Sequence, residues 1–206
     1  MRSLWLVFIL AASPLLAQQA TAPTPELGLT LAGISAPGRT TAAGNALSVA
    51  NGVAFQVNYG RFLRSYKYAD LNWEVNFAAS PHQNVTTTAP GATPDYASFF
   101  FTPGVRIKFY PKNKLSPWAV GGGGYALYVQ NTSTIAGAAN TASRTSNTGA
   151  LEFGGGLDYR WSPRLSFRIE ARDFYTGSPN FNVPVEGRGQ FNFVAGGGVV
   201  FHLGLK

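Results

Sequence analysis

The stretch Asp70-Leu71-Asn72-Trp73-Glu74-Val75-Asn76-Phe77 alternates between polar and apolar residues at every position. Successive side chains of a β-strand point to opposite faces, so one face carries Asp, Asn and Glu while the other carries Leu, Trp, Val and Phe. Alternation sustained over the whole stretch predicts a β-strand with one polar and one apolar surface. The surroundings of this strand must therefore indicate which surface faces inward.

The same alternation recurs along the chain, whereas helical periodicity is weak. Together with 70–77, the sequence predicts eight strands, the other seven being 26–34, 53–60, 99–110, 118–130, 151–161, 165–172 and 191–203. The predicted connections alternate in length. The long ones, rich in Gly, Ala, Thr and Asn, are 35–52, 80–97, 131–148 and 177–189. The short ones are 61–67, 111–116 and 162–163.

This pattern indicates an all-β fold, an eight-stranded antiparallel up-and-down transmembrane β-barrel over residues 26–206. Barrels of bacterial outer membranes have short periplasmic turns and long extracellular loops. A closed ring also satisfies every backbone group within lipid. An even number of strands places both chain ends on the short-turn side, so we expect both termini in the periplasm.

The N-terminal residues predict export. Arg2 precedes an apolar run at 4–12, and a small residue follows at Ala17, which is the layout of a signal peptide over residues 1–17. Ala20 is an alternative cleavage site, and residues 18–25 form a short linker. Only 12% of the residues are charged and none is cysteine. A soluble domain carries about twice that charge, so the composition favours a surface that faces lipid.

If the apolar faces meet lipid, the polar faces fill the barrel. Eleven charged residues lie on these faces: Glu26, Asp70, Glu74, Arg106, Lys108, Glu152, Asp158, Arg160, Arg168, Glu170 and Arg172. Buried charges are tolerated when they are paired, and the acids and bases of this set nearly balance. An eight-stranded barrel is just wide enough to be filled by side chains. The sequence therefore predicts an ionic network that plugs the lumen.

Aromatic residues gather where the predicted strands end. A periplasmic girdle is expected from Tyr66, Tyr68, Phe109, Tyr110, Trp118, Tyr159, Trp161 and Phe201. A sparser outer girdle is expected from Phe77, Phe99, Phe101, Tyr128, Tyr175 and Phe191. Basic residues cluster beside the short turns: Arg61, Arg64, Lys67, Lys112, Lys114, Arg164 and Lys206. In an exported protein we expect these bases to meet anionic lipid headgroups and no nucleic acid.

Weaker motifs have structural interpretations. Glycine runs occur at 121–124, 154–156 and 196–198. They lack the helix start and Lys-Ser/Thr of a phosphate loop, so we expect them to curve the wall. His82, Ser80 and Asp95 share one predicted loop, a weak basis for catalysis, and we expect no enzyme activity, cofactor or metal site. Pro103 interrupts a predicted strand, where a β-bulge would accommodate it.

Three segments carry a family resemblance: 101–110 (FTPGVRIKFY), 154–161 (GGGLDYRW) and the last strand, 193–203. In these the chain resembles the small outer-membrane β-barrel family, with its OmpA-type transmembrane domains and OmpX-like proteins. The last strand, with Gly198, Phe201 and Leu203, is similar to the signal read by the outer-membrane assembly machinery. It departs from that signal because Gly204-Leu205-Lys206 follow where an aromatic residue is expected.

The resemblance implies a monomer in outer-membrane lipid, handled by the assembly machinery during biogenesis. The leading functional hypothesis is a scaffold with a filled lumen and flexible polar loops, acting in envelope structure or surface interaction. A small pore or transport protein is the alternative. A lipid-modifying enzyme at the rim and a soluble lipocalin-like binder remain as further hypotheses. The residues identify no ligand and no extracellular partner.

Overall fold

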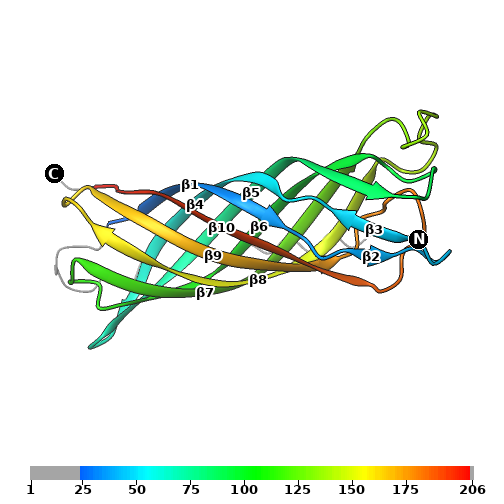
Figure 1. The fold of residues 1–206 in the computed structure, drawn as a ribbon. Helices are drawn as coiled ribbons and strands as arrows, with labels where there is room; N and C mark the ends of the chain where they lie inside the picture. The colour runs from blue at the N-terminus through cyan, green and yellow to red at the C-terminus, as the bar shows by residue number, and fades with distance from the viewer. Residues whose placement is uncertain (1–23, 205–206) are drawn as a thin grey trace, which may run out of the picture.

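The computed structural model describes residues 24–204, which form a barrel of tilted strands (Figure 1). The predicted signal peptide at 1–17 and the alternative cleavage site at Ala20 lie outside the described residues. Within 24–204 the strands are β1 (Glu26–Ser35), β2 (Arg39–Thr40), β3 (Ala46–Val49), β4 (Gly52–Ser65), β5 (Ala69–Thr87), β6 (Asp95–Phe109), β7 (Leu115–Gln130), β8 (Thr145–Arg160), β9 (Leu165–Gly177) and β10 (Gly189–His202).

Eight of these described strands close a ring in which every neighbouring pair is antiparallel. β1 pairs with both β4 and β10, so the first and last strands close the barrel. β2 and β3 form a hairpin within the first long connection, and β3 pairs with the far end of β5. The short turns and the end of β10 lie at one end, the turn end; β2, β3 and the long connections lie at the other, the loop end (Figure 1). The predicted eight-stranded transmembrane barrel fold is confirmed.

Each predicted strand overlaps a barrel strand, but several strands are longer than predicted. The loop predicted at 80–97 is wrong over most of its length, because β5 continues to Thr87 and β6 begins at Asp95. Likewise β4 continues to Ser65 and β8 begins at Thr145. Near the barrel ends neither strand face needs to be apolar, so alternation stops there although backbone pairing continues.

The two strand faces have a polarity opposite to that of a soluble protein. Arg106, Arg168 and Arg172 are among the largest fully buried side chains. By contrast, Leu31 is 59% exposed and Ile169 is 63% exposed on the outer wall. An outer wall of large apolar side chains around a polar interior is the arrangement that a barrel adopts in lipid. No helix within residues 24–204 is long and apolar enough to cross a membrane.

Inward-facing glycines allow neighbouring strands to approach closely. A Cβ atom on Gly198 would strike the β1 backbone and lie 2.7 Å from the Cα of Thr30. A Cβ atom on Gly104 would lie 2.7 Å from the Cα of Gly122 in β7. These glycines are required by the close backbone approach at the curved inner face of the wall, in agreement with the structural interpretation of the glycine runs.

The β-bulge predicted at Pro103 is wrong. Pro103 pairs with Val75 in regular register with β5, and the β6–β7 pairing resumes in the same register at Gly104. The missing N–H of proline is thus accommodated by a local gap in the β6–β7 ladder. The shifts of register lie elsewhere, in β4 between Phe62 and Arg64 and in β5 between Ser80 and Gln83.

Candidate functional site

Most of the predicted interior charges meet in one network inside the turn-end half of the barrel, which we call the ionic layer. Its members are Glu26, Glu74, Arg106, Lys108, Glu152, Asp158, Arg168, Glu170 and Arg172. Apart from Glu26, whose side chain is 14% exposed, every member is exposed by 5% or less. Charges this deeply buried are stable only when paired, and each member has at least one partner of opposite charge.

Arg172 of β9 joins three carboxylates. Its Nη1 atom lies 2.8 Å from a carboxylate oxygen of Glu74 and also bonds Glu152. Its Nε and Nη2 atoms both donate to one oxygen of Glu170, at 3.0 and 2.9 Å. A planar guanidinium can hold several acceptors at fixed angles. Arg172 therefore ties β5, β8 and its own strand together across the lumen.

Glu26 of β1 is the corresponding acidic centre nearer the turn end. Its carboxylate accepts from Arg106 and from Lys108, the latter at 3.0 Å. Lys108 also lies 2.9 Å from Asp158, which binds Arg168 through two bonds of 2.7 and 3.0 Å. The network thus runs without a break from β1 to β9 and fills this half of the barrel.

Trp118 corrects a prediction. It was expected on the lipid face as part of the periplasmic girdle, but it is 3% exposed and points into the barrel. Its Nε1–H donates to Asp158 at 3.1 Å, and the guanidinium of Arg168 lies 4.8 Å from its ring centre. Arg106 and Arg172 also lie over this ring, at 5.7 and 5.0 Å. The indole is therefore part of the ionic layer.

Asp70 and Arg160 lie outside the network in which they were predicted. Asp70 accepts a 2.7 Å hydrogen bond from the hydroxyl of Ser65. Arg160 donates to the backbone oxygen of Pro111 at 2.7 Å. Both lie where strands end at the turn end: Asp70 bonds the last residue of β4, and Arg160 bonds a residue of the β6–β7 turn. In addition to Trp118, inward-facing amides such as Asn76, which donates to Glu152 at 3.1 Å, extend the network beyond the predicted charges.

The other predicted girdle residues lie on the outside at the turn end. These are Tyr66, Tyr68, Phe109, Tyr110, Tyr159, Trp161 and Phe201, whose exposed fractions run from 39% to 67%. The outer-girdle prediction is wrong for Tyr128, which is 0% exposed inside the barrel. The hydroxyl of Tyr128 is bonded to Thr176 at 2.6 Å and accepts from Asn192 at 3.1 Å.

A second set of side chains, the aromatic layer, fills the loop-end half. It consists of Tyr96, Phe100, Tyr128, Phe174 and Phe181, each exposed by 1% or less. The rings of Phe100 and Phe174 stack with centres 4.6 Å apart, and Tyr96 packs edge-on against Tyr128 and Phe181. Phe181 comes from the last long connection, so this loop inserts a ring into the mouth of the barrel.

The four long connections were expected to be flexible, but they are hydrogen-bonded to each other as one outer cap of residues 36–51, 88–94, 131–144 and 178–188. Thr41 forms a β-bridge with Val185, which joins the first connection to the last. The amide of Thr93 donates to the carbonyl of Phe181 at 2.9 Å. The amide of Ile135 donates to the carbonyl of Ala92 at 2.8 Å, which joins the second and third connections.

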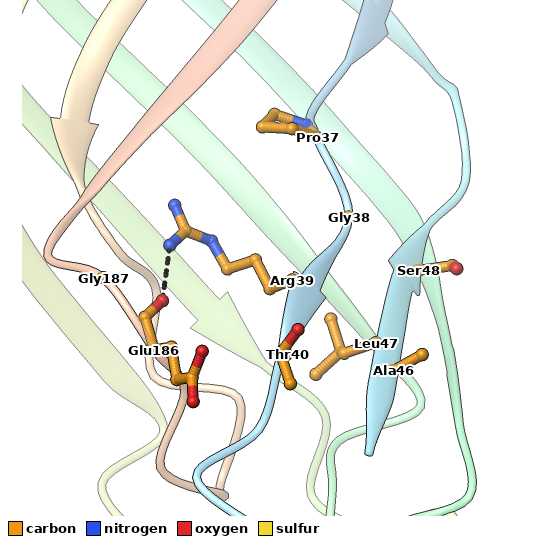
Figure 2. A pocket seen from close by; sticks show the side chains of 9 residues that line it. All are labelled: Pro37, Gly38, Arg39, Thr40, Ala46, Leu47, Ser48, Glu186 and Gly187. Atoms are coloured by element: carbon orange, nitrogen blue, oxygen red, sulfur yellow. Dashed lines mark hydrogen bonds between the residues drawn. The ribbon is translucent and has the colours of Figure 1, made fainter. Parts of the chain in front are cut away.

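A hollow of about 660 Å³ lies on this cap between the β2–β3 hairpin and Glu186–Gly187 (Figure 2). Arg39 spans it, donating to the backbone oxygen of Glu186 at 3.2 Å and to that of Gly189. Partial burial lowers the pKa of Arg39, and the nearby phenols, Tyr128 foremost, act in the opposite direction. Because two guanidinium nitrogens are already bonded to the backbone, Arg39 primarily holds the first and last connections together.

The catalytic constellation considered for His82 is not assembled. Ser80 is buried and faces inward, whereas His82 is exposed and bonds Asn84 at 2.9 Å. The Nδ1 atom of His82 lies 3.9 Å from Asp95. Thus the serine lies on the opposite strand face from the histidine that would have to activate it. Within residues 24–204, no group of three or more His, Cys, Asp or Glu is placed to hold a metal ion.

Solved structures with similar folds are small outer-membrane barrels. Neisserial surface protein A matches with a TM-score of 0.57 at 14% identity, over 87% of this chain and 97% of that one. OprG of Pseudomonas aeruginosa matches with a TM-score of 0.59 at 11% identity, over 89% and 97%. AlkL in lipid bilayers matches with a TM-score of 0.54 at 11% identity, over 94% and 96%. No family model and no curated protein sequence matches. The chain therefore has the fold of the small outer-membrane β-barrels.

Proposed function

We propose that this protein is an outer-membrane scaffold whose lumen stays closed and whose outer cap meets partners at the cell surface. The observation that carries the proposal is that side chains fill both halves of the lumen, the ionic layer at the turn end and the aromatic layer at the loop end. A water-filled path through the barrel would have to pass both layers. The cap adds a surface of four mutually bonded connections, and rigid scaffolds commonly place recognition in such loops.

Planar-bilayer recording on the purified full chain tests whether the lumen is closed. We expect no steady conductance from the parent protein, because the ionic layer consists of interlocked side chains that leave water little room. A steady water-filled conductance would instead support a pore or transport protein, the alternative function. The insertion of folded protein is checked in the same sample by the change in gel mobility between boiled and unboiled protein.

The proposal also places the turn end in the periplasm, with the cap outside, as short turns and long loops indicate. The absence of native cysteine allows a direct test. Ala136→Cys lies in the cap and Asn113→Cys in a turn, and both positions are exposed. On intact cells, a maleimide that cannot cross membranes should label the first variant only. Labelling of Asn113→Cys alone would reverse the proposed orientation.

A further inference from the structure

Two arginines at the turn end share the lipid-facing side of β4 because of a shift of register. Arg61 pairs with Trp73, and Arg64 pairs with Leu71, residues of β5 that both face outward. In a regular strand, residues three apart point to opposite faces. The extra residue at Leu63 changes this parity, as a β-bulge does. Both guanidinium groups therefore project from the outer wall at the turn end of the barrel.

Aromatic rings surround these arginines at the edge of the apolar wall. Tyr59 and Trp73 pack edge-on with ring centres 5.5 Å apart; Trp73 is the cross-strand partner of Arg61, and Tyr59 lies two residues further toward the middle of the barrel. Arg64 lies over the ring of Tyr66 at 5.4 Å, and Lys67 lies over the ring of Tyr68 at 5.1 Å. Rings with a polar tip occupy headgroup depth in a bilayer, so the cations beside them lie at that depth as well.

The bases around these rings form no salt bridge with any described residue. We define the basic collar as Arg61, Arg64, Lys67, Lys112 and Lys114, all of which are exposed. No carboxylate within residues 24–204 lies within salt-bridge distance of any of them. The nearest turn-end acid in sequence, Asp70, faces inward and is bonded to Ser65. The positive charge of the collar is thus left for an external partner.

The charge at the loop end is different. There the exposed bases Arg144 and Arg188 stand with the acids Asp95 and Glu186 and with Arg39, whose guanidinium is bonded to the cap. A cluster of exposed bases without acids among them is therefore a feature of the turn end. Such a local excess attracts an anionic membrane surface by about 1 kcal/mol for each Lys or Arg near it.

We propose that the basic collar binds the phosphates of anionic glycerophospholipids in the leaflet around the turn end, with Arg61 and Arg64 as its main phosphate-binding residues. Arginine presents a planar fork of donors that fits a phosphate. Its long stem can lie along the apolar wall while the guanidinium remains among the headgroups. The lipid phosphate supplies the negative charge that the chain itself does not, while its acyl chains cover the apolar wall above.

The test measures the preference of the bilayer-inserted full chain for spin-labelled phosphatidylglycerol over spin-labelled phosphatidylcholine. We expect the parent to prefer phosphatidylglycerol, and the preference to fall as salt is raised. R61Q/R64Q should reduce the relative association constant by about fivefold for each arginine, which corresponds to 1 kcal/mol. The matched control R144Q/R188Q removes the same charge at the loop end and should leave the preference unchanged.

Either of two results would overturn the proposal. One is equal association of both lipids with the parent chain, which would leave the collar for an acidic periplasmic protein. The other is a loss of preference that is the same in R61Q/R64Q and R144Q/R188Q, because the lipid preference would then depend only on the net charge of the protein and not on the collar. Because the substituted side chains are exposed, both variants should fold, and their heat-dependent gel mobility verifies this.

Discussion

Replacing Arg172 with methionine tests most directly whether the ionic layer holds this barrel together. Methionine keeps much of the length and apolar volume of the side chain but removes the guanidinium. Three buried carboxylates then lose a cation at once: Glu74, Glu152 and Glu170. Glu74 retains Arg106 at 3.2 Å, whereas Glu170 keeps the amide of Gln56, at 3.2 Å, and no cation within residues 24–204.

The expected loss of unfolding free energy follows from these contacts. Removing one partner of a buried ion pair costs about 3–5 kcal/mol, because the remaining charge is left without compensation. R172M should lie in this range. The double variant R172M/E170Q removes one of the two carboxylates left without a cation, Glu152 being the other. It should recover about 0.5–3 kcal/mol, the usual size of coupling between residues in one network. R160M is the matched control and should cost less than about 1 kcal/mol, because Arg160 lies outside the network.

The measurement is urea unfolding of each variant in the same lipid vesicles, followed by tryptophan fluorescence. Heat-dependent gel mobility shows beforehand that each variant has folded. If R172M unfolded within about 1 kcal/mol of the parent, the arginine would contribute little beyond its volume, and the account of the ionic layer would fail. Equal losses of unfolding free energy in R172M and R160M would also contradict this account, because burial in the network would then make no difference.

Three further predictions address the wall, the indole and the cap. Gly198→Ala should cost about 1–3 kcal/mol in urea unfolding because its Cβ would strike the β1 backbone, whereas Gly149→Ala, with open space around it, should change stability by less than about 0.5 kcal/mol. Trp118→Phe should cost about 2 kcal/mol in the same assay, since it loses the indole hydrogen bond to a buried carboxylate. Phe181→Ala should make the last long connection cleavable by trypsin at Arg188 while the barrel stays folded; equal resistance of variant and parent would contradict the packed cap.

The fold was predictable because contact with lipid restricts which residues can occupy the outward-facing strand positions. Lipid requires an apolar residue at every second position, so β5 shows its alternation clearly from Leu71 to Phe77. Beyond the lipid-facing part of the strand this requirement ends. Residues 80–87 are still paired in β5, but their sequence is typical of a polar loop. Strand bounds at the loop end therefore depend on long-range pairing, which the local pattern does not contain.

The candidate site was predictable only where charge marks a strand face. β6, β8 and β9 each carry charged residues on one face, and most of these side chains do lie inside. β7 has no charged residue over Leu115–Gln130, so neither face is marked. An aromatic residue such as Trp118 or Tyr128 is suited both to a headgroup girdle and to a polar interior. Residue type alone therefore placed both side chains on the lipid face, although they lie inside the barrel.

The separation of the two layers determines what opening the barrel would require. The ionic layer is held by charge pairing and is weakened by loss of a single partner such as Arg172. The aromatic layer is held by packing of uncharged rings, including the Phe100–Phe174 stack, and is not weakened by that change. R172M should therefore be less stable yet still fail to conduct in planar bilayers, because the loop-end half remains packed. Conductance from R172M alone would mean that the ionic layer is the only barrier, and the aromatic layer would then have no part in closing the lumen.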